Sequence, residues 1–198
     1  YPHARIVHID TTRAEKLIGV RAVATVEDTP KKKHGSYRSG VKDELIFALD
    51  RVRYVGDEVA AAAAIDGETA QEALSLIRVE YEELPAVFAI DEAMAPQAPR
   101  IHEEAEGNIA SHAVTVRGDP EQGFREADLV MEERFETGLQ IHAYMEPVGC
   151  IALWDSNGKL TLWAPSQNPS WARFIFSDAL DVPMGKLRVV QTLIGGAF

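Results

Sequence analysis

The sequence contains one cysteine, Cys150, among 198 residues. A single cysteine cannot form a disulfide within the chain, nor can it build an all-cysteine metal site or an iron–sulfur cluster from this chain alone. We therefore expect a reducing, cytoplasmic setting. No second histidine stands at ligand spacing from His142, so we expect no protein-ligated metal ion.

The sequence also lacks any apolar stretch close to the roughly 20 residues of a membrane-spanning helix. Its net charge of −11 argues against nucleic acid as a partner, because such binding relies on Lys and Arg neutralising phosphates. The same charge argues against an anionic membrane surface. Tyr1-Pro2-His3 runs at once into a strand-like segment, so we expect the sequence to begin inside a domain.

The first half of the chain predicts two strand–helix–strand units, which together form a compact α+β unit. Alternating or β-branched apolar residues predict strands at 5–9, 20–26, 59–65 and 78–83. Helices are predicted after Asp10 or Thr11 and after Asp66 or Thr69, the second with an apolar face of Ala70, Ala73, Leu74 and Ile77. The basic segment 30–36 between them is predicted to be a mobile, solvated loop, with phosphate binding as the alternative.

Residues 85–110 change character, because prolines, alanines and acidic residues follow one another there with little periodicity; we expect a linker. Beyond it, strands are predicted at 113–117, 129–135, 150–154, 160–163 and 187–194. Asn157-Gly158 should supply the positive φ angles of a hairpin turn. Two helices are predicted, one after Asp119-Pro120 anchored by Phe124, and one after Asn168-Pro169 with an apolar side of Trp171, Phe174, Ile175 and Leu180.

Two turns carry residues with the chemistry to bind a ligand. Gly195-Gly196 follows the last predicted strand, and paired glycines let backbone N–H groups approach an anion; a plain turn that needs glycine is the alternative. Gln167 lies between a strand and a helix, where catalytic groups often sit, and its amide both donates and accepts. A capping turn built on Asn168 is the alternative there. His142 and Glu146 have the chemistry of metal ligands or of an acid/base pair.

In their order along the chain, the motifs resemble the molybdenum-cofactor-binding large subunit of the xanthine dehydrogenase and aldehyde oxidase family. In the first half, the matching segments are Tyr1-Pro2-His3-Ala4-Arg5-Ile6, Leu17-Ile18-Gly19-Val20, 52–60 and 79–85. In the second half, they are 118–128, His142-Ala143-Tyr144-Met145-Glu146-Pro147, Ser166-Gln167-Asn168-Pro169 and Gly195-Gly196-Ala197-Phe198. The resemblance covers essentially the whole chain and rests on this ordered run.

The resemblance implies an α+β fold in which a hammerhead α/β domain over 1–86 and a linker over 87–110 precede the opening of a mixed-sheet molybdopterin-binding domain over 111–198. It implies that Gln167, as a catalytic and cofactor-binding residue, hydrogen-bonds a ligand of the molybdenum. It also implies that Gly195, Gly196 and Phe198 pass the pterin and the metal. Glu146 and His142 lie near the cofactor in this resemblance and receive no catalytic step.

The resemblance further implies an oxidoreductase subunit whose molybdopterin, expected in its cytosine dinucleotide form, hydroxylates an aldehyde, N-heterocycle or aromatic substrate with oxygen from water. Iron–sulfur clusters and FAD are expected on partner subunits of a cytoplasmic hetero-oligomer. Because further pterin contacts and the general base are expected beyond Phe198, the chain alone should neither hold the cofactor stably nor turn over. Which substrate and which electron acceptor the enzyme uses does not follow from the sequence.

Two other functions remain open at this point. One is a non-catalytic split-subunit or interaction module that completes the cofactor pocket of another chain. The other is an unrelated acidic α+β binding domain in which the glycine turn is merely structural.

Overall fold

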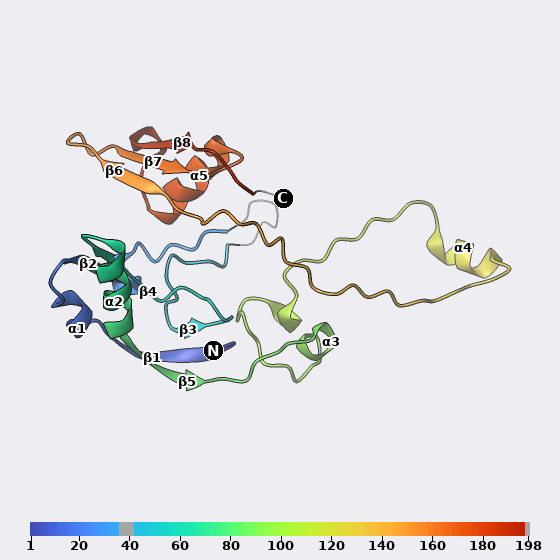
Figure 1. Ribbon diagram of the computed structural model, residues 1–198. Coiled ribbons are helices and arrows are strands. Elements are labelled where there is room, and N and C mark those ends of the chain that lie inside the picture. Colours follow the sequence, from blue (N-terminus) through green and yellow to red (C-terminus); the bar gives the residue numbers. More distant parts are fainter. Residues whose placement is uncertain (36–41, 197–198) are drawn as a thin grey trace.

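The computed structural model describes residues 1–35 and 42–196 in three parts (Figure 1). The N-terminal unit comprises the described residues up to 110, and the C-terminal unit comprises 150–196. Between them in sequence, residues 111–149 form an extended arm whose tip projects away from both units. Ser36 of the predicted basic loop and Phe198 of the glycine loop lie outside the described residues.

Two antiparallel sheets form the N-terminal unit. Strand β1 (Ala4–Asp10) lies between β3 (Arg51–Val52) and β5 (Arg78–Glu83), and β2 (Val20–Thr25) pairs with β4 (Ala60–Ala64). The alternation predicted for β5 is confirmed, since Val79 and Tyr81 are half-buried and Glu80 and Glu82 are exposed. The buried core under β1 comprises Ala4, Ala48 and Val52, with Ile6, Val59 and Tyr81 packed against it.

Two helices, α1 (Thr12–Glu15) and α2 (Gly67–Leu76), contact each other and the second sheet. Asp66 caps α2 by accepting a hydrogen bond from the N–H of Thr69 at 2.8 Å, and this bond lowers the pKa of the Asp66 carboxyl. Ala73 is fully buried, but Leu74 is 42% exposed, so the predicted apolar face is too wide. Helix α2 contacts strand β4, which is made of five alanines. Their small side chains offer little apolar surface against which Leu74 could be buried.

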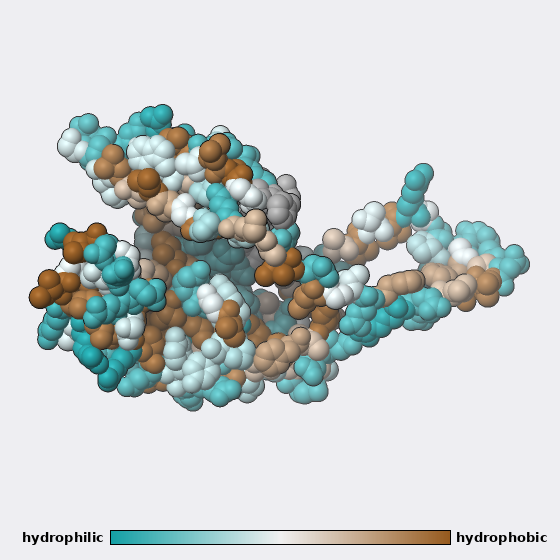
Figure 2. All heavy atoms as spheres, viewed as in Figure 1, coloured by the Kyte–Doolittle hydropathy of each residue, from teal (hydrophilic) through white to brown (hydrophobic). Residues whose placement is uncertain are grey.

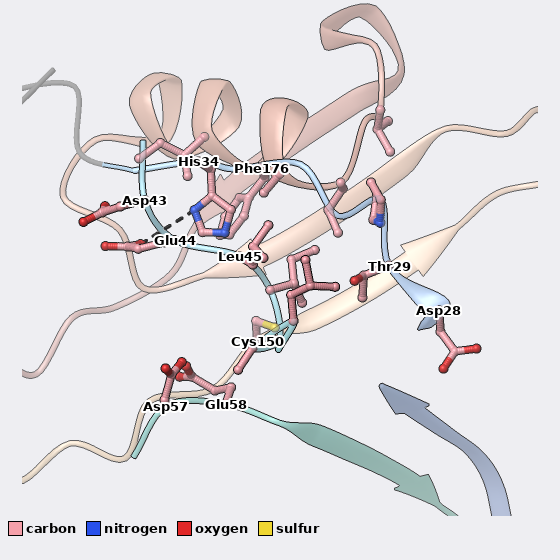
Figure 3. A pocket seen from close by; sticks show the side chains of 18 of the residues that line it. Asp28, Thr29, His34, Asp43, Glu44, Leu45, Asp57, Glu58, Cys150 and Phe176 are labelled. Atoms are coloured by element: carbon pink, nitrogen blue, oxygen red, sulfur yellow. Dashed lines mark ion pairs between the residues drawn. The ribbon is translucent and has the colours of Figure 1, made fainter. Parts of the chain in front are cut away.

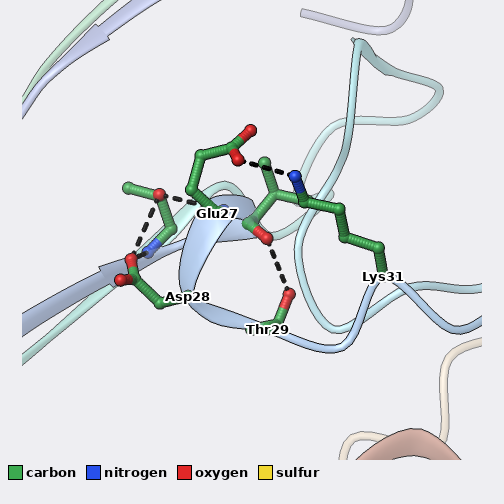
Figure 4. Close-up of polar contacts among 6 residues, drawn as sticks. Glu27, Asp28, Thr29 and Lys31 are labelled. Carbon is green, nitrogen blue, oxygen red and sulfur yellow. Dashed lines mark hydrogen bonds and ion pairs between the residues drawn. The ribbon is translucent and has the colours of Figure 1, made fainter.

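The basic loop begins from a capped 3-10 turn, η1 (Val26–Asp28), which Figure 4 shows. The Asp28 carboxylate accepts a hydrogen bond from the N–H of Thr25 at 2.8 Å, and the Thr29 hydroxyl donates to the carbonyl oxygen of Val26 at 3.1 Å. Lys31 then reaches back to Glu27 at 2.6 Å. The first lysine of the loop is therefore paired with a carboxylate of the protein.

Residues 85–110 contain two short helices, α3 (Ile90–Ala93) and η2 (Glu106–Asn108). The Asn108 side chain ties the segment together. It donates to the carbonyl oxygens of Ala93 (2.8 Å) and Pro99 (3.0 Å) and accepts from the N–H of Ile101 (2.9 Å). Arg53 donates to the carbonyl oxygen of Ile101 at 3.0 Å, so this proline-rich segment lies against the rest of the N-terminal unit.

The arm contains one regular element, α4 (Pro120–Glu126), in residues 111–149, all of which the structure describes. Asp119 caps this helix, as predicted, by accepting from the N–H of Gln122 at 3.0 Å. The strands predicted at 113–117 and 129–135 do not form, because no described strand lies beside them to pair with their backbone groups. Phe124 is 66% exposed and anchors nothing among the described residues, and Figure 2 shows further apolar side chains exposed along the arm.

The C-terminal unit is a three-stranded sheet with one covering helix. Strands β6 (Ile151–Trp154) and β7 (Leu160–Ala164) form the predicted hairpin, and α5 (Pro169–Ala179) crosses over to β8 (Leu187–Gln191), which pairs in parallel with β7. A short 3-10 turn, η3 (Met184–Lys186), leads into β8. The core contains the buried residues Leu160, Leu162, Val182 and Leu187, with Phe176, Leu180 and Val189 packed against them.

Two sequence predictions for this unit need correction. In the hairpin turn only Gly158 has a positive φ, of 71°; Asn157 does not, because the Asp155 carboxylate accepts from the N–H groups of Asn157 and Lys159 and shapes the turn instead. On α5, Phe174 lies at the exposed edge and stacks on Trp171 with ring centroids 5.3 Å apart.

No described helix is both long and apolar enough to cross a membrane.

A buried histidine joins the start of β1 to the end of β5, and its removal tests this junction. His3 is 3% exposed, and its Nδ1 donates to the carbonyl oxygen of Pro85 at 2.7 Å. We expect His3→Ala to lower the free energy of unfolding by about 1–3 kcal/mol, because the buried imidazole and its hydrogen bond to Pro85 are lost. His8→Ala, at an exposed position on β1, is the control. Urea unfolding followed by circular dichroism measures both, and equal effects of the two variants would contradict the prediction.

Candidate functional site

The predicted site residues follow two neighbouring parallel strands at the same edge of the C-terminal sheet. Ala164 at the end of β7 lies opposite Gln191 at the end of β8, and Thr192 extends the pair by donating to the carbonyl oxygen of Ala164 at 3.2 Å. Gln167 comes shortly after β7, and Gly195 comes shortly after β8. Ligands bind outside the carboxyl ends of strands in open α/β sheets, so this edge is the candidate site.

In the turn between β7 and α5, the residue that caps the helix is not Gln167. Asn168 caps the helix by accepting from the N–H of Trp171 at 3.0 Å, and the Ser166 hydroxyl accepts from the N–H of Asn168 at 3.3 Å. Pro169 occupies the first helical position. The cap therefore explains Asn168 and Pro169, whereas Gln167 is exposed at the sheet edge and takes no part in the cap.

Gly195 is a glycine because another residue approaches it closely. Its φ is not among the positive values of the described glycines, so the backbone angle alone does not require glycine. A Cβ placed on Gly195 would lie 2.9 Å from the Cβ of Glu146 and 3.0 Å from its Oε2. The N–H of Gly195 donates a hydrogen bond to that same carboxylate oxygen. A close approach, rather than a plain turn, therefore excludes a side chain here.

Sequence reasoning placed Glu146 near the cofactor but missed its contact with Gly195. This contact joins residues 49 positions apart, for which no local pattern provides a signal. Gly196, next to this contact, is half-buried. His142 is exposed on the arm, and within residues 1–35 and 42–196 no group of three or more His, Cys, Asp or Glu side chains is placed to hold a metal ion.

A separate cavity of about 1110 Å³ lies between the N-terminal and C-terminal units (Figure 3). Apolar side chains of both units line it, and so do five carboxylates of the N-terminal unit: Asp28, Asp43, Glu44, Asp57 and Glu58. Cys150 also lines the cavity, and His34 approaches Glu44 at 3.6 Å. Burial, followed by the charges of Glu58 and Asp57, raises the pKa of the Tyr54 hydroxyl in this cavity. None of the predicted site residues lines it.

Ion pairs join the basic loop to the far end of α5. Lys32 lies 3.0 Å from Asp178 and 3.3 Å from Asp181, and Lys42 lies 2.5 Å from Asp178. The hydrogen bonds from Lys42 and then Lys32 lower the pKa of the Asp178 carboxyl, and the bond to Asp178 raises the pKa of Lys32. We call Lys32, Lys42, Asp178 and Asp181 the lysine clamp.

The remaining lysine of the loop is also paired within the protein. Lys33 donates to Glu104, and this hydrogen bond lowers the pKa of the Glu104 carboxyl to about 2. Lys31, Lys32 and Lys33 are thus exposed, as predicted for a solvated loop, but each is matched by a carboxylate. This internal pairing argues against the alternative that the loop binds phosphate.

Comparison with protein families matches both halves of the chain. A model described as the aldehyde oxidase and xanthine dehydrogenase a/b hammerhead domain matches residues 1–85. A model described as the molybdopterin cofactor-binding domain matches residues 101–198. Gln167, Gly195 and Glu146 all lie within the second match.

Similar curated proteins and solved structures agree with these families. The chain is 42% identical to a probable xanthine dehydrogenase subunit of Bacillus subtilis and 35% identical to the nicotinate dehydrogenase large molybdopterin subunit of Eubacterium barkeri; all of the chain aligns with 26% and 45% of those proteins. The aldehyde oxidoreductase of Desulfovibrio gigas superposes on all of the chain with a TM-score of 0.86 at 26% identity. The alignment covers 22% of that structure. The chain thus spans less than half the length of these relatives.

The pH dependence of stability tests the lysine clamp. Because the folded-state pKa of Asp178 is lowered, its stabilisation is present above the ordinary carboxyl pKa and is lost as the pH falls through the folded value. Asp178→Asn should lower the melting temperature at pH 7, and its difference from wild type should shrink as the pH falls below the ordinary carboxyl pKa. High salt should shrink the difference at pH 7. Asp128→Asn, in the exposed arm, is the control. A difference from wild type that is the same at pH 7 and pH 3 would contradict the ion-pair account.

Proposed function

The chain belongs to the aldehyde oxidase and xanthine dehydrogenase family, and we propose that it forms part of the molybdopterin-binding catalytic subunit of a molybdenum hydroxylase. The proposed enzyme oxidises an aldehyde, an N-heterocycle or an aromatic substrate and takes its oxygen from water. One observation carries the proposal. Gln167 and Gly195 follow the carboxyl ends of two adjacent parallel strands inside the segment that matches the cofactor-binding domain.

The chemistry of this edge fits a molybdenum–pterin group. The pterin itself ligates the metal, so the protein needs neutral hydrogen-bond donors and close backbone approach there rather than a cluster of His and Cys side chains. Gln167 offers a neutral amide, and the loop at Gly195-Gly196 offers close approach of its backbone, because a side chain is sterically excluded at Gly195. When bound, the group supplies the two-electron oxidation of the substrate and the transfer of oxygen.

The residues of this chain would orient the group rather than react themselves. The Gln167 amide would donate a hydrogen bond to a ligand of the metal without adding charge to the site. Gly196 and Phe198 would bring the backbone of the glycine loop alongside the pterin. His142 has no step in this scheme, because it is exposed on the arm.

We propose the same assembly that the sequence resemblance implies. The cofactor would be the cytosine dinucleotide form, and iron–sulfur and flavin subunits would complete a cytoplasmic hetero-oligomer. Two relatives are named as subunits, which supports such an assembly, and exposed apolar side chains along the arm suit burial against further polypeptide. A hammerhead domain over 1–86, a linker over 87–110 and a cofactor-binding segment over 111–198 remain our proposed division.

Purification of the native complex tests the function. We expect the complex that contains this chain to carry molybdenum, iron and flavin, and to reduce a dye with an aldehyde or an N-heterocycle. Turnover in oxygen-18 water should label the product. Molybdenum with no turnover on any substrate of these classes would contradict the proposed substrates. A complex without molybdenum would contradict the proposed function itself.

Substitution of Gln167 tests its assigned role. Gln167→Ala removes the amide while leaving the helix cap at Asn168 intact, so the fold should be preserved. We expect activity to fall roughly 10–100-fold, as when other residues that orient metal ligands are removed. Gln71→Ala, at an exposed glutamine of α2, is the matched control. Steady-state kinetics normalised to molybdenum content measures the effect. Unchanged kcat in Gln167→Ala would exclude this role.

A further inference from the structure

Glu146 is the one residue of the stretch 111–150, all of it described, that is not exposed. The arm thus leaves its large apolar side chains open and covers a carboxylate. What covers it is the glycine loop, because Glu146 accepts the hydrogen bond from the N–H of Gly195. A hydrogen bond from a backbone N–H to an ionised carboxylate is stronger than one between neutral groups. The contact therefore singles out Glu146 from the other acidic residues of the arm.

We propose that Glu146 is a positioning residue, whose carboxylate fixes the backbone at Gly195 so that the neighbouring Gly196 faces the cofactor. The proposal rests on the proposed function of this sheet edge. It gives Gly195 a structural task, because its N–H is engaged by a side chain of the protein and is not available to a ligand.

The glycine loop depends on the hydrogen bond from Gly195 to Glu146, because the sheet ends just before the loop. The parallel ladder extends to Thr192, which donates to the carbonyl oxygen of Ala164. Leu193, the next residue, is 93% exposed, so packing of an apolar side chain does not fix the loop at that point. The contact at Gly195 comes two residues later and connects the loop to the arm rather than to the sheet.

Steric fit and backbone strain both show that this contact is specific. A Cβ at Gly195 would lie within 3.2 Å of three atoms of Glu146, so any larger residue would push the two segments apart. On the arm, Ala143 has a φ of 50°, a conformation that costs free energy for a residue with a side chain. That strained turn precedes Glu146 by three residues and belongs to the segment that brings the carboxylate onto the loop.

The negative charge of Glu146 has a consequence for the cofactor. A carboxylate already placed at the Gly195 N–H disfavours an anionic group at the same point, since like charges repel. The phosphate part of the cofactor should therefore lie away from Gly195. Neutral parts of the group should lie beside Gly196.

The test compares Glu146→Ala with Glu146→Gln in the holoenzyme complex. The glutamine keeps an oxygen that accepts the Gly195 N–H, whereas alanine does not. We expect Glu146→Ala to lower the molybdenum content per complex roughly tenfold or more and to speed protease cleavage in the glycine loop. Glu146→Gln should stay within about threefold of wild type in both readouts, because a neutral acceptor keeps most of the hydrogen bond. Glu136→Ala, at an exposed glutamate of the arm, is the control.

The outcomes separate the two proposals. Wild-type complex without molybdenum would refute the proposed function. Wild-type molybdenum content and protection in Glu146→Ala would overturn the positioning role alone. Equal losses in the Ala and Gln variants would also overturn it, because the hydrogen bond would not be the cause. If Glu146→Ala fails to assemble, Gly195→Ala serves instead, and a wild-type content of molybdenum in that variant would overturn the proposal.

Discussion

The candidate site depends on the parallel pairing of β7 with β8. A parallel pair needs a crossover, and α5 provides it, so both strands present their carboxyl ends at one edge. Leu160 and Leu162 on β7 and Leu187 on β8 fix the register because they are buried on the face covered by α5. A slip of one residue would turn these side chains to the opposite face. The edge that carries Gln167 and Gly195 is thus determined by a hydrophobic core that contains neither residue.

Helix α5 is fixed at both ends, and the contacts at its end connect the C-terminal unit with the N-terminal unit. At its start, Asn168 caps the helix directly after Gln167. At its end, the lysine clamp brings two cations to Asp178, close to the carboxyl-terminal end of the helix dipole, where positive charge is favourable. Each exposed ion pair contributes little alone, but Asp178 is shared by two lysines and is mostly buried. The clamp therefore couples the N-terminal unit to the helix that follows Gln167.

The sequence predicts the parts of this structure whose causes are local. Caps at Asp66, Asp119 and Asn168 are confirmed, because each depends on residues one turn away. The two arm strands fail, although their residues favour strands, because pairing depends on a neighbouring strand that the described residues do not supply. The two strands that carry the candidate site are predicted, since each places apolar side chains in the core. The exposure of Leu74 and Phe174 was not predictable from the sequence. Periodicity indicates which face of a helix is apolar, but it does not indicate how much of that face the neighbouring elements cover.

Glu146 shows the limit of sequence reasoning most clearly. Its motif points toward the cofactor through the family resemblance, yet its partner Gly195 lies 49 residues away and both residues have simpler local explanations. The glycine pair alone suggests an anion nest, and a carboxylate at the N–H of Gly195 is what such a nest would attract. Here the anion belongs to the protein, and the arm that carries it is otherwise exposed. The glycine loop and the arm therefore stabilise each other through one polar contact, so whatever polypeptide covers the apolar surface of the arm also affects the geometry of the cofactor site.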